Sequence, residues 1–150
     1  MTLTDYLAEQ DVPFQAILHP PAYTASKLAK YLHVSGGDVA KAVLLRGPRG
    51  FFVAVLPATR QADLGKLAAA QGGPVRLAST EEIVETFMDC EWGVVSPFGS
   101  LYGLPTLLDE RIASRPWIVV EAGTHTDAVR LSARDFARLA GCERGDFAAG

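Results

Sequence analysis

The sequence has few of the features that mark membrane, secreted or disulfide-bonded proteins. Its 150 residues contain no apolar run of the roughly 20 residues that a membrane-spanning helix needs. The first residues, MTLTDYLAEQ, have neither the basic nor the apolar segment of a secretory signal. Two cysteines, Cys90 and Cys142, lie far apart without CxxC spacing, which argues against a disulfide framework and a zinc site. We therefore expect a soluble, cytoplasmic protein with no membrane partner.

Sequence signatures of several common catalytic sites are also missing. The chain has no GxSxG, Walker, GxGxxG or HExxH motif. Its three histidines, His19, His33 and His125, are too scattered to indicate a metal site, so we expect neither a metal nor a cofactor. The acidic pair at 109–110 could act in acid–base chemistry, although neighbouring residues on a strand point apart and such pairs more often cap a helix or face solvent.

Positive charge is in the minority overall, but it is unevenly distributed. The formal net charge is −3, yet residues 27–76 carry eight Lys or Arg residues against two Asp residues. One side of the molecule could therefore attract a polyanion that the whole chain would repel. A basic surface without a function would have the same composition, so the pattern leaves both interpretations open.

Hydrophobic periodicity and turn residues predict an α+β fold in one domain, residues 1–150. Gly36 and Gly37 are expected to stop the second helix. Because helices and strands alternate irregularly, a mixed or antiparallel sheet is favoured over a doubly wound one. Helices are predicted at 2–10, 24–34, 62–71, 79–88 and 132–141. Strands are predicted at 13–19, 75–78, 117–122 and 128–132, and at 39–46 and 51–57, which form a hairpin at the centre of the sheet.

A lysine inside an apolar strand is one unusual feature of the chain. Lys41 lies in DVAKAVLLR, where burial of an unpaired ammonium is unfavourable, so the position indicates an anionic partner. Segment 90–110 is a second unusual feature, because it combines five Gly or Pro residues with many large apolar side chains. Such a segment is typical of a rigid loop that could form one wall of a pocket, or of an ordinary crossover between strands.

Five short segments, taken together, resemble one protein family. HPPAYTA at 19–25, AKAVLLR at 40–46, GVVSPFG at 93–99, DE at 109–110 and AGTH at 122–125 resemble, in order and spacing, the YbaK/prolyl-tRNA synthetase-associated editing domains. The resemblance implies a mixed, mostly antiparallel, curved and barrel-like sheet flanked by helices. It also implies a free-standing trans-editing enzyme, an aminoacyl-tRNA deacylase that hydrolyses the ester between a wrong amino acid and tRNA. Misacylated tRNA is the implied partner, with a prolyl-tRNA synthetase as a second.

The resemblance also implies roles for individual residues. Lys41 matches the family lysine that contacts the phosphate of the terminal adenosine, and Gly123 and His125 match an element near the scissile ester; these three are the expected catalytic residues. His19 matches a histidine near the pocket mouth. Backbone groups and a ribose hydroxyl of the tRNA would position the attacking water without a metal. The aminoacyl pocket would be lined by Gly93, Val94, Val95, Ser96, Pro97, Phe98 and Gly99. The basic residues expected to bind tRNA are Lys27, Lys30, Arg46 and Arg49.

The resemblance leaves the substrate and two other function classes open. The first expectation is a small noncognate amino acid such as Ala on tRNA(Pro); Ser, Thr, Cys and 2-aminobutyrate are alternatives, because Ala42 stands where some alanine-specific relatives carry asparagine. One other class is a module that binds tRNA or another nucleic acid through residues 27–76 without turnover. The other is a small-molecule ester or amide hydrolase with His125 as its general base. The sequence does not indicate an oligomeric state.

Overall fold

The computed structural model describes residues 2–149, which form short helices and strands in an irregular order. The helices are α1 (Leu3–Glu9), α2 (Ala25–Leu32), α3 (Leu64–Gln71), α4 (Thr80–Thr86), α5 (Glu110–Ala113) and α6 (Ala133–Ala140), with 3₁₀ turns η1 (Gly36–Asp38) and η2 (Gly99–Tyr102). The strands are β1 (Phe14–Leu18), β2 (Ala40–Gly47), β3 (Gly50–Pro57), β4 (Gln61–Ala62), β5 (Arg76–Leu77), β6 (Thr106–Asp109), β7 (Trp117–Glu121), β8 (Asp127–Ser132), β9 (Glu143–Gly145) and β10 (Ala148–Ala149).

The predicted hairpin forms the centre of a five-stranded sheet with the order β5-β2-β3-β6-β9. β2 and β3 pair antiparallel over their whole length, with Lys41 opposite Leu56. β5 joins β2 antiparallel, whereas β6 runs parallel to β3 and β9 runs parallel to β6. The sheet is therefore mixed, which confirms the predicted α+β class and the central position of the hairpin.

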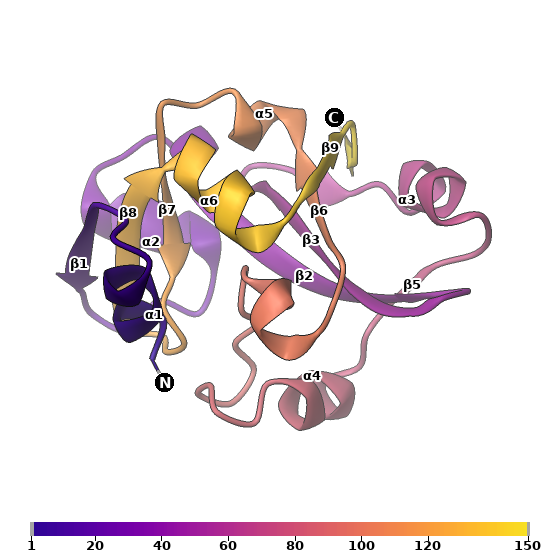
Figure 1. The fold of residues 1–150 in the computed structure, drawn as a ribbon, viewed down its shortest axis with the longest axis horizontal. Coiled ribbons are helices and arrows are strands. Elements are labelled where there is room, and N and C mark those ends of the chain that lie inside the picture. The colour runs from indigo at the N-terminus through magenta and orange to yellow at the C-terminus, as the bar shows by residue number, and fades with distance from the viewer. Residues whose placement is uncertain (1, 150) are drawn as a thin grey trace.

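A second sheet, with the order β1-β8-β7, is antiparallel and lies beside the first (Figure 1). The two sheets meet where Val39, just before β2, forms a parallel bridge with Val119 of β7. β10 and β4 form a small two-stranded sheet. The strands between residues 2 and 149 thus belong to three sheets flanked by helices, and they do not close into a barrel.

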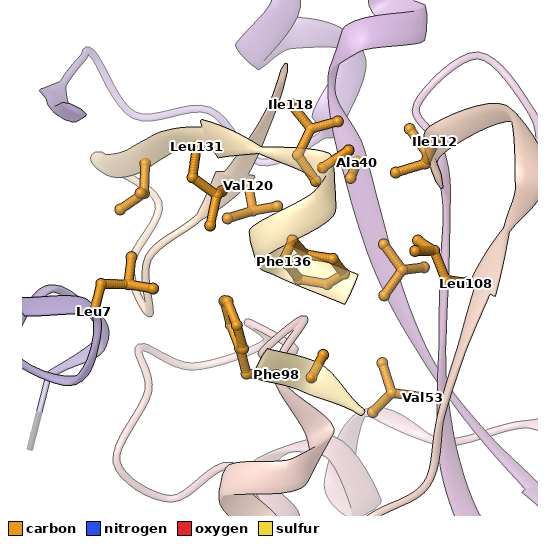
Figure 2. Close-up of a cluster of buried hydrophobic side chains, with 14 of the residues drawn as sticks. Leu7, Ala40, Val53, Phe98, Leu108, Ile112, Ile118, Val120, Leu131 and Phe136 are labelled. Carbon is orange, nitrogen blue, oxygen red and sulfur yellow. The ribbon is translucent and has the colours of Figure 1, made fainter. Parts of the chain in front are cut away.

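The largest hydrophobic core draws its side chains from both large sheets and from α1, α5 and α6 (Figure 2). Phe98 and Phe136 lie at its centre with their rings edge to face and their centroids 4.9 Å apart. Phe98 also contacts Tyr6 of α1. Burying a phenylalanine stabilises a fold by roughly 1.5–3 kcal/mol. Because Phe98 belongs to the predicted substrate loop, this packing fixes the loop to the rigid part of the molecule.

Capping residues explain where the helices begin. Thr2 and Ser79 each form a capping box with the acidic residue three positions later. The side chains of Thr24 and Ser132 accept hydrogen bonds from the N–H groups three residues on, at the start of α2 and α6. These four helix starts agree with the sequence prediction.

Helix α2 ends before the glycines that were expected to stop it. Its last residue is Leu32, and His33 follows in the left-handed conformation with φ 54°. Gly36 and Gly37 instead form η1, which Ser35 caps. The prediction was wrong here because a C-terminal left-handed residue is usually glycine, whereas this helix uses a histidine.

The sequence prediction missed the shortest elements, namely β4, β9, β10 and α5. Two or three residues carry too little periodicity to identify a strand, and β9 is held by pairing with β6, which is distant in sequence. Among residues 2–149, no helix is long and apolar enough to cross a membrane.

Candidate active site

A pocket of about 170 Å³ lies where the two large sheets meet. Its walls are β2, the end of β7, the start of α2 and the loop after α4. These segments are distant in sequence, so the pocket is a product of the tertiary fold. Of the predicted site residues, it brings together Lys41, Gly93, Val95, Pro97 and His125.

Lys41 projects its half-buried side chain into this pocket from the central hairpin. Burial lowers the pKa of Lys41, and no acceptor offsets this effect. Among the described residues, no carboxylate forms an ion pair with its ammonium. The protein therefore holds a partly desolvated cation without an anion, as expected for a group that binds an anionic ligand.

The loop 93–99 alternates between the pocket and the protein interior. Gly93, Val95 and Pro97 line the pocket, whereas Val94 and Phe98 are buried in the opposite direction. Such alternation is typical of extended backbone. The other predicted loop residues are also buried: the Ser96 hydroxyl accepts a hydrogen bond from the Phe98 N–H at 3.2 Å, and Gly99 packs closely under Thr106. Only every second residue of the loop thus contacts the pocket.

Two predicted glycines support the loop through their backbone. Gly93 and Gly123 have φ values of 86° and 90°, which favour glycine. The Gly123 carbonyl accepts a hydrogen bond of 2.7 Å from the Glu91 N–H, which ties the β7–β8 turn to the loop. Gly123 and Ser96 line a second cavity of about 560 Å³ on the other side of the loop. The structure therefore does not place Gly123 in the pocket that contains Lys41.

His125 contributes a ring to the pocket wall, but both of its nitrogens are occupied or buried. Nε2 lies 3.2 Å from the Trp92 carbonyl, which can only accept, so Nε2 donates. Nδ1 is buried without a hydrogen-bond partner. The exposed Tyr23 ring stacks on the imidazole, with the centroids 4.8 Å apart. His125 therefore shapes the pocket mouth and presents no free nitrogen to a ligand.

His19 lies outside the pocket lining, although it supports the same region. Its backbone N–H donates to the Thr126 carbonyl at 2.9 Å, and its Nδ1 lies 2.7 Å from the Pro20 carbonyl. The side chain is buried. It connects the segment before α2 to the β7–β8 turn, in which His125 lies.

The four basic residues predicted to bind tRNA fall into two groups. Lys27 and Lys30 are exposed on α2, the helix whose first turn forms part of the pocket. Arg46 and Arg49 lie at the opposite end of the hairpin from Lys41, and Arg46 stacks on the Phe51 ring. Five residues of strand separate Lys41 from Arg46, a distance of about 17 Å. The structure brings only the first group close to the pocket.

The sequence prediction missed a pocket residue, Glu121. It is the last residue of β7 and lines the pocket together with Lys41 and His125. Burial raises the pKa of Glu121 to about 7, and the nearby Glu91 acts in the same direction. A signal was present: WIVVEA places an acidic residue at the end of an apolar strand, the same anomaly that identified Lys41.

The acidic pair at 109–110 lies outside the pocket, and its first member has a structural role. Asp109 is fully buried, caps α5 and accepts a hydrogen bond of 2.8 Å from the Phe147 N–H. The interpretation that such pairs cap a helix is confirmed for Asp109. Within the part of the chain that the structure describes, no cluster of three or more His, Cys, Asp or Glu residues is arranged to hold a metal ion.

Comparison with proteins of known structure shows the same fold. A hypothetical protein of known crystal structure matches with a TM-score of 0.88 at 20% identity, over 98% of this chain and 99% of that chain. The crystal structure of a candidate trans-editing enzyme for prolyl-tRNA synthetase matches with a TM-score of 0.76 at 26% identity, over 91% of this chain and 87% of that chain.

Sequence comparisons identify the family. A Ser/Thr-tRNA deacylase of Escherichia coli K12, ProXp-y, is 28% identical over 147 residues, which cover 94% of this chain and 87% of that protein. A proline–tRNA ligase of Thermosipho africanus is 28% identical over 93 residues, 61% of this chain and 16% of the ligase. The sequence model of the aminoacyl-tRNA editing domain matches residues 19–139, which span both large sheets and the whole pocket. The chain therefore belongs to the aminoacyl-tRNA editing domain family, and the resemblance seen in its sequence is confirmed.

Proposed function

We propose that residues 1–150 form one free-standing editing domain that hydrolyses the ester of a small noncognate amino acid on tRNA. The observation that carries this proposal is the unpaired Lys41 ammonium, which shares a small pocket with the 93–97 loop. A phosphate is a suitable anion for a buried ammonium. Aminoacylated tRNA has a phosphate one nucleoside away from its ester, so one ligand can satisfy both walls. Because tRNA is charged in the cytoplasm, we propose that compartment for the protein.

The loop supplies groups that can act on the ester itself. Among the described residues, the backbone N–H groups of Gly93 and Val95 donate no hydrogen bond to another residue. We assign them to the carbonyl oxygen, whose negative charge grows in the transition state. An aminoacyl ester is already activated, so fixing it in line with a water held by a ribose hydroxyl supplies much of the acceleration. Gly123 and His125 position this loop from the β7–β8 turn.

The size of the pocket favours a small amino acid, selected by steric exclusion. Ser and Thr now stand beside Ala as preferred candidates, because the Escherichia coli relative is named a Ser/Thr-tRNA deacylase. tRNA(Pro) is our preferred carrier, because relatives include a proline–tRNA ligase and a candidate trans-editing enzyme for prolyl-tRNA synthetase. A prolyl-tRNA synthetase is accordingly the proposed protein partner. One methylene changes acceptance by only about 1–3 kcal/mol, so several small amino acids are expected to be substrates.

Release of amino acid from charged tRNA tests the proposal directly. tRNA(Pro) and other tRNAs are charged with Ala, Ser, Thr, Cys, 2-aminobutyrate or Pro and incubated with the protein. We expect hydrolysis of at least one small noncognate ester and none of prolyl-tRNA(Pro). Binding of tRNA without release from any of these substrates would contradict deacylation and favour the binding module.

The two basic groups give a second expected result. Removing both charges on α2, by Lys27→Ala with Lys30→Ala, should raise KM and lower the salt dependence of binding by about one unit of slope per lost phosphate contact. The matched double variant at the hairpin end, Arg46→Ala with Arg49→Ala, removes the same charge far from Lys41 and should change KM little. The measurement is KM against salt concentration. A larger effect at the hairpin would place tRNA on the other end of the sheet.

The geometry argues against a hydrolase that uses His125 as its base. A general base needs a nitrogen within hydrogen-bond reach of the substrate or of a bound water. Here Nε2 donates to the Trp92 carbonyl, and Nδ1 is buried. Turnover of small esters without tRNA, with a pH profile governed by a histidine, would contradict our assignment.

A further inference from the structure

Glu121 and Lys41 lie on neighbouring strands without neutralising one another. The parallel bridge between Val39 and Val119 aligns β2 with β7, and both charged residues lie two positions beyond it. Each therefore has the same strand parity as its bridge residue, and both line the pocket. Nevertheless, no ion pair joins them. The pocket thus offers a cation on one wall and a carboxyl on another.

The groups around Glu121 leave its carboxyl available. Lys41 faces it from β2, His125 from the β7–β8 turn and Glu91 from the loop after α4. Glu91 is engaged, since it accepts a hydrogen bond of 3.1 Å from the His125 N–H. The Glu121 carboxyl forms no hydrogen bond to any residue between 2 and 149 and no ion pair among them. A partly buried carboxylate in this state is stabilised by a cationic ligand.

We propose that Glu121 binds the α-ammonium group of the aminoacyl ester. This inference rests on the proposed function. The aminoacylated terminal nucleoside carries a phosphate at one end and an ammonium at the other, and the two unpaired groups of the pocket match these charges in sign. Lys41 takes the phosphate and Glu121 takes the ammonium. Binding of the ammonium also favours the ionised form of a carboxyl whose pKa burial has raised to about 7.

The consequence is a pocket that selects for a free amino group. An ester whose nitrogen is acylated has the same phosphate, ribose and side chain, but it lacks the positive charge. It would leave the Glu121 carboxylate unpaired and would bring an additional acyl group into a small pocket. The structure thus favours elongator-type aminoacyl esters over N-blocked ones.

A stable analogue separates this inference from catalysis. The probe is 3′-deoxy-3′-(serylamino)adenosine 5′-monophosphate, in which an amide replaces the ester, together with its N-acetyl derivative. Their Kd values are measured for the wild type, Glu121→Gln and the matched control Glu85→Gln, which removes one exposed carboxylate of α4. We expect Glu121→Gln to weaken binding of the free amine by about 10- to 100-fold, as for a hydrogen bond to a charged group. Binding of the N-acetyl derivative should change less than about threefold, and Glu85→Gln should match the wild type.

Each other outcome overturns the inference. Equal loss for both probes would indicate a structural or base role for Glu121, and no loss for either would remove it from recognition. Failure of the wild type to bind the free amine in preference to the N-acetyl derivative, or to bind either, would also contradict it. Glutamine has nearly the same shape and removes a buried charge, so we expect the variant to fold, which its thermal unfolding checks. Deacylation of charged tRNA is measured separately, so failure of the proposed function would show as absent hydrolysis while the binding result still decides the inference.

Discussion

Lys41→Met is expected to reduce kcat/KM for deacylation by about 100-fold or more while leaving the protein folded. Truncating one partner of a buried charged contact costs about 2–5 kcal/mol, and the lost partner here is the proposed phosphate. Methionine keeps the length and apolar stem of the lysine, so the wall of the pocket is retained. The measurement is the rate of amino acid release over a range of charged tRNA concentrations. Arg134→Met removes one exposed positive charge from α6, outside the pocket, and should leave the rate unchanged.

The stability of the same variant provides an independent check. Burial lowers the pKa of Lys41, so the unfolded chain binds more protons than the folded chain between that lowered pKa and the ordinary value of 10.5. The wild type should therefore gain stability as the pH rises through this window, and Lys41→Met should lack that gain. Its thermal midpoint at neutral pH should equal or exceed that of the wild type. A large loss of stability would mean that the ammonium has a structural partner and is not reserved for a ligand.

Asp109→Ala is expected to lower the free energy of unfolding by about 3–5 kcal/mol, the usual cost of removing one partner from a buried ion pair. The Asp109 carboxylate accepts from the Phe147 N–H at 2.8 Å and from the Arg111 N–H at 3.0 Å, and it pairs with the Arg111 guanidinium. Its removal would leave a buried N–H without a partner and loosen the segment leading to β10. Urea unfolding followed by circular dichroism measures the loss.

A neighbouring carboxylate supplies the matched control for this experiment. Asp146 contacts the same Arg111 guanidinium at 3.1 Å, but it is exposed, and such surface pairs contribute about 0–1 kcal/mol. Asp146→Ala should therefore cost far less than Asp109→Ala. Activity per folded molecule should be unchanged in both variants, because neither residue lines the pocket. A selective loss of turnover in Asp109→Ala would revive the acid–base interpretation of the 109–110 pair.

Local chemistry made part of this structure predictable. The hairpin was predictable because two apolar runs flank a Gly-Pro turn, and Lys41 stood out because a charge in an apolar strand has few structural explanations. The pocket-lining members of the loop were only partly predictable. Extended backbone divides neighbours between two faces, so Gly93 and Pro97 reach the pocket while Ser96 turns away from it.

Long-range pairing and small deviations from the pattern account for the rest. The division into separate sheets depends on contacts such as the bridge between Val39 and Val119, which no local periodicity encodes. The end of α2 was misplaced because His33 adopts a conformation usually reserved for glycine. Glu121 was overlooked because the end of a strand is an ordinary place for a charge, and only the fold reveals that this end faces a cavity.

The bridge between Val39 and Val119 is an isolated contact, after which β2 and β7 are no longer paired. A ligand in the pocket therefore spans a seam between two otherwise separate sheets and adds a contact that the chain alone does not make. Binding of this kind stabilises the assembled state over any partly opened one in proportion to ligand concentration. Substrate and seam are thus thermodynamically linked: occupancy favours docking of the two sheets, and any loosening of the seam weakens affinity by the same free energy.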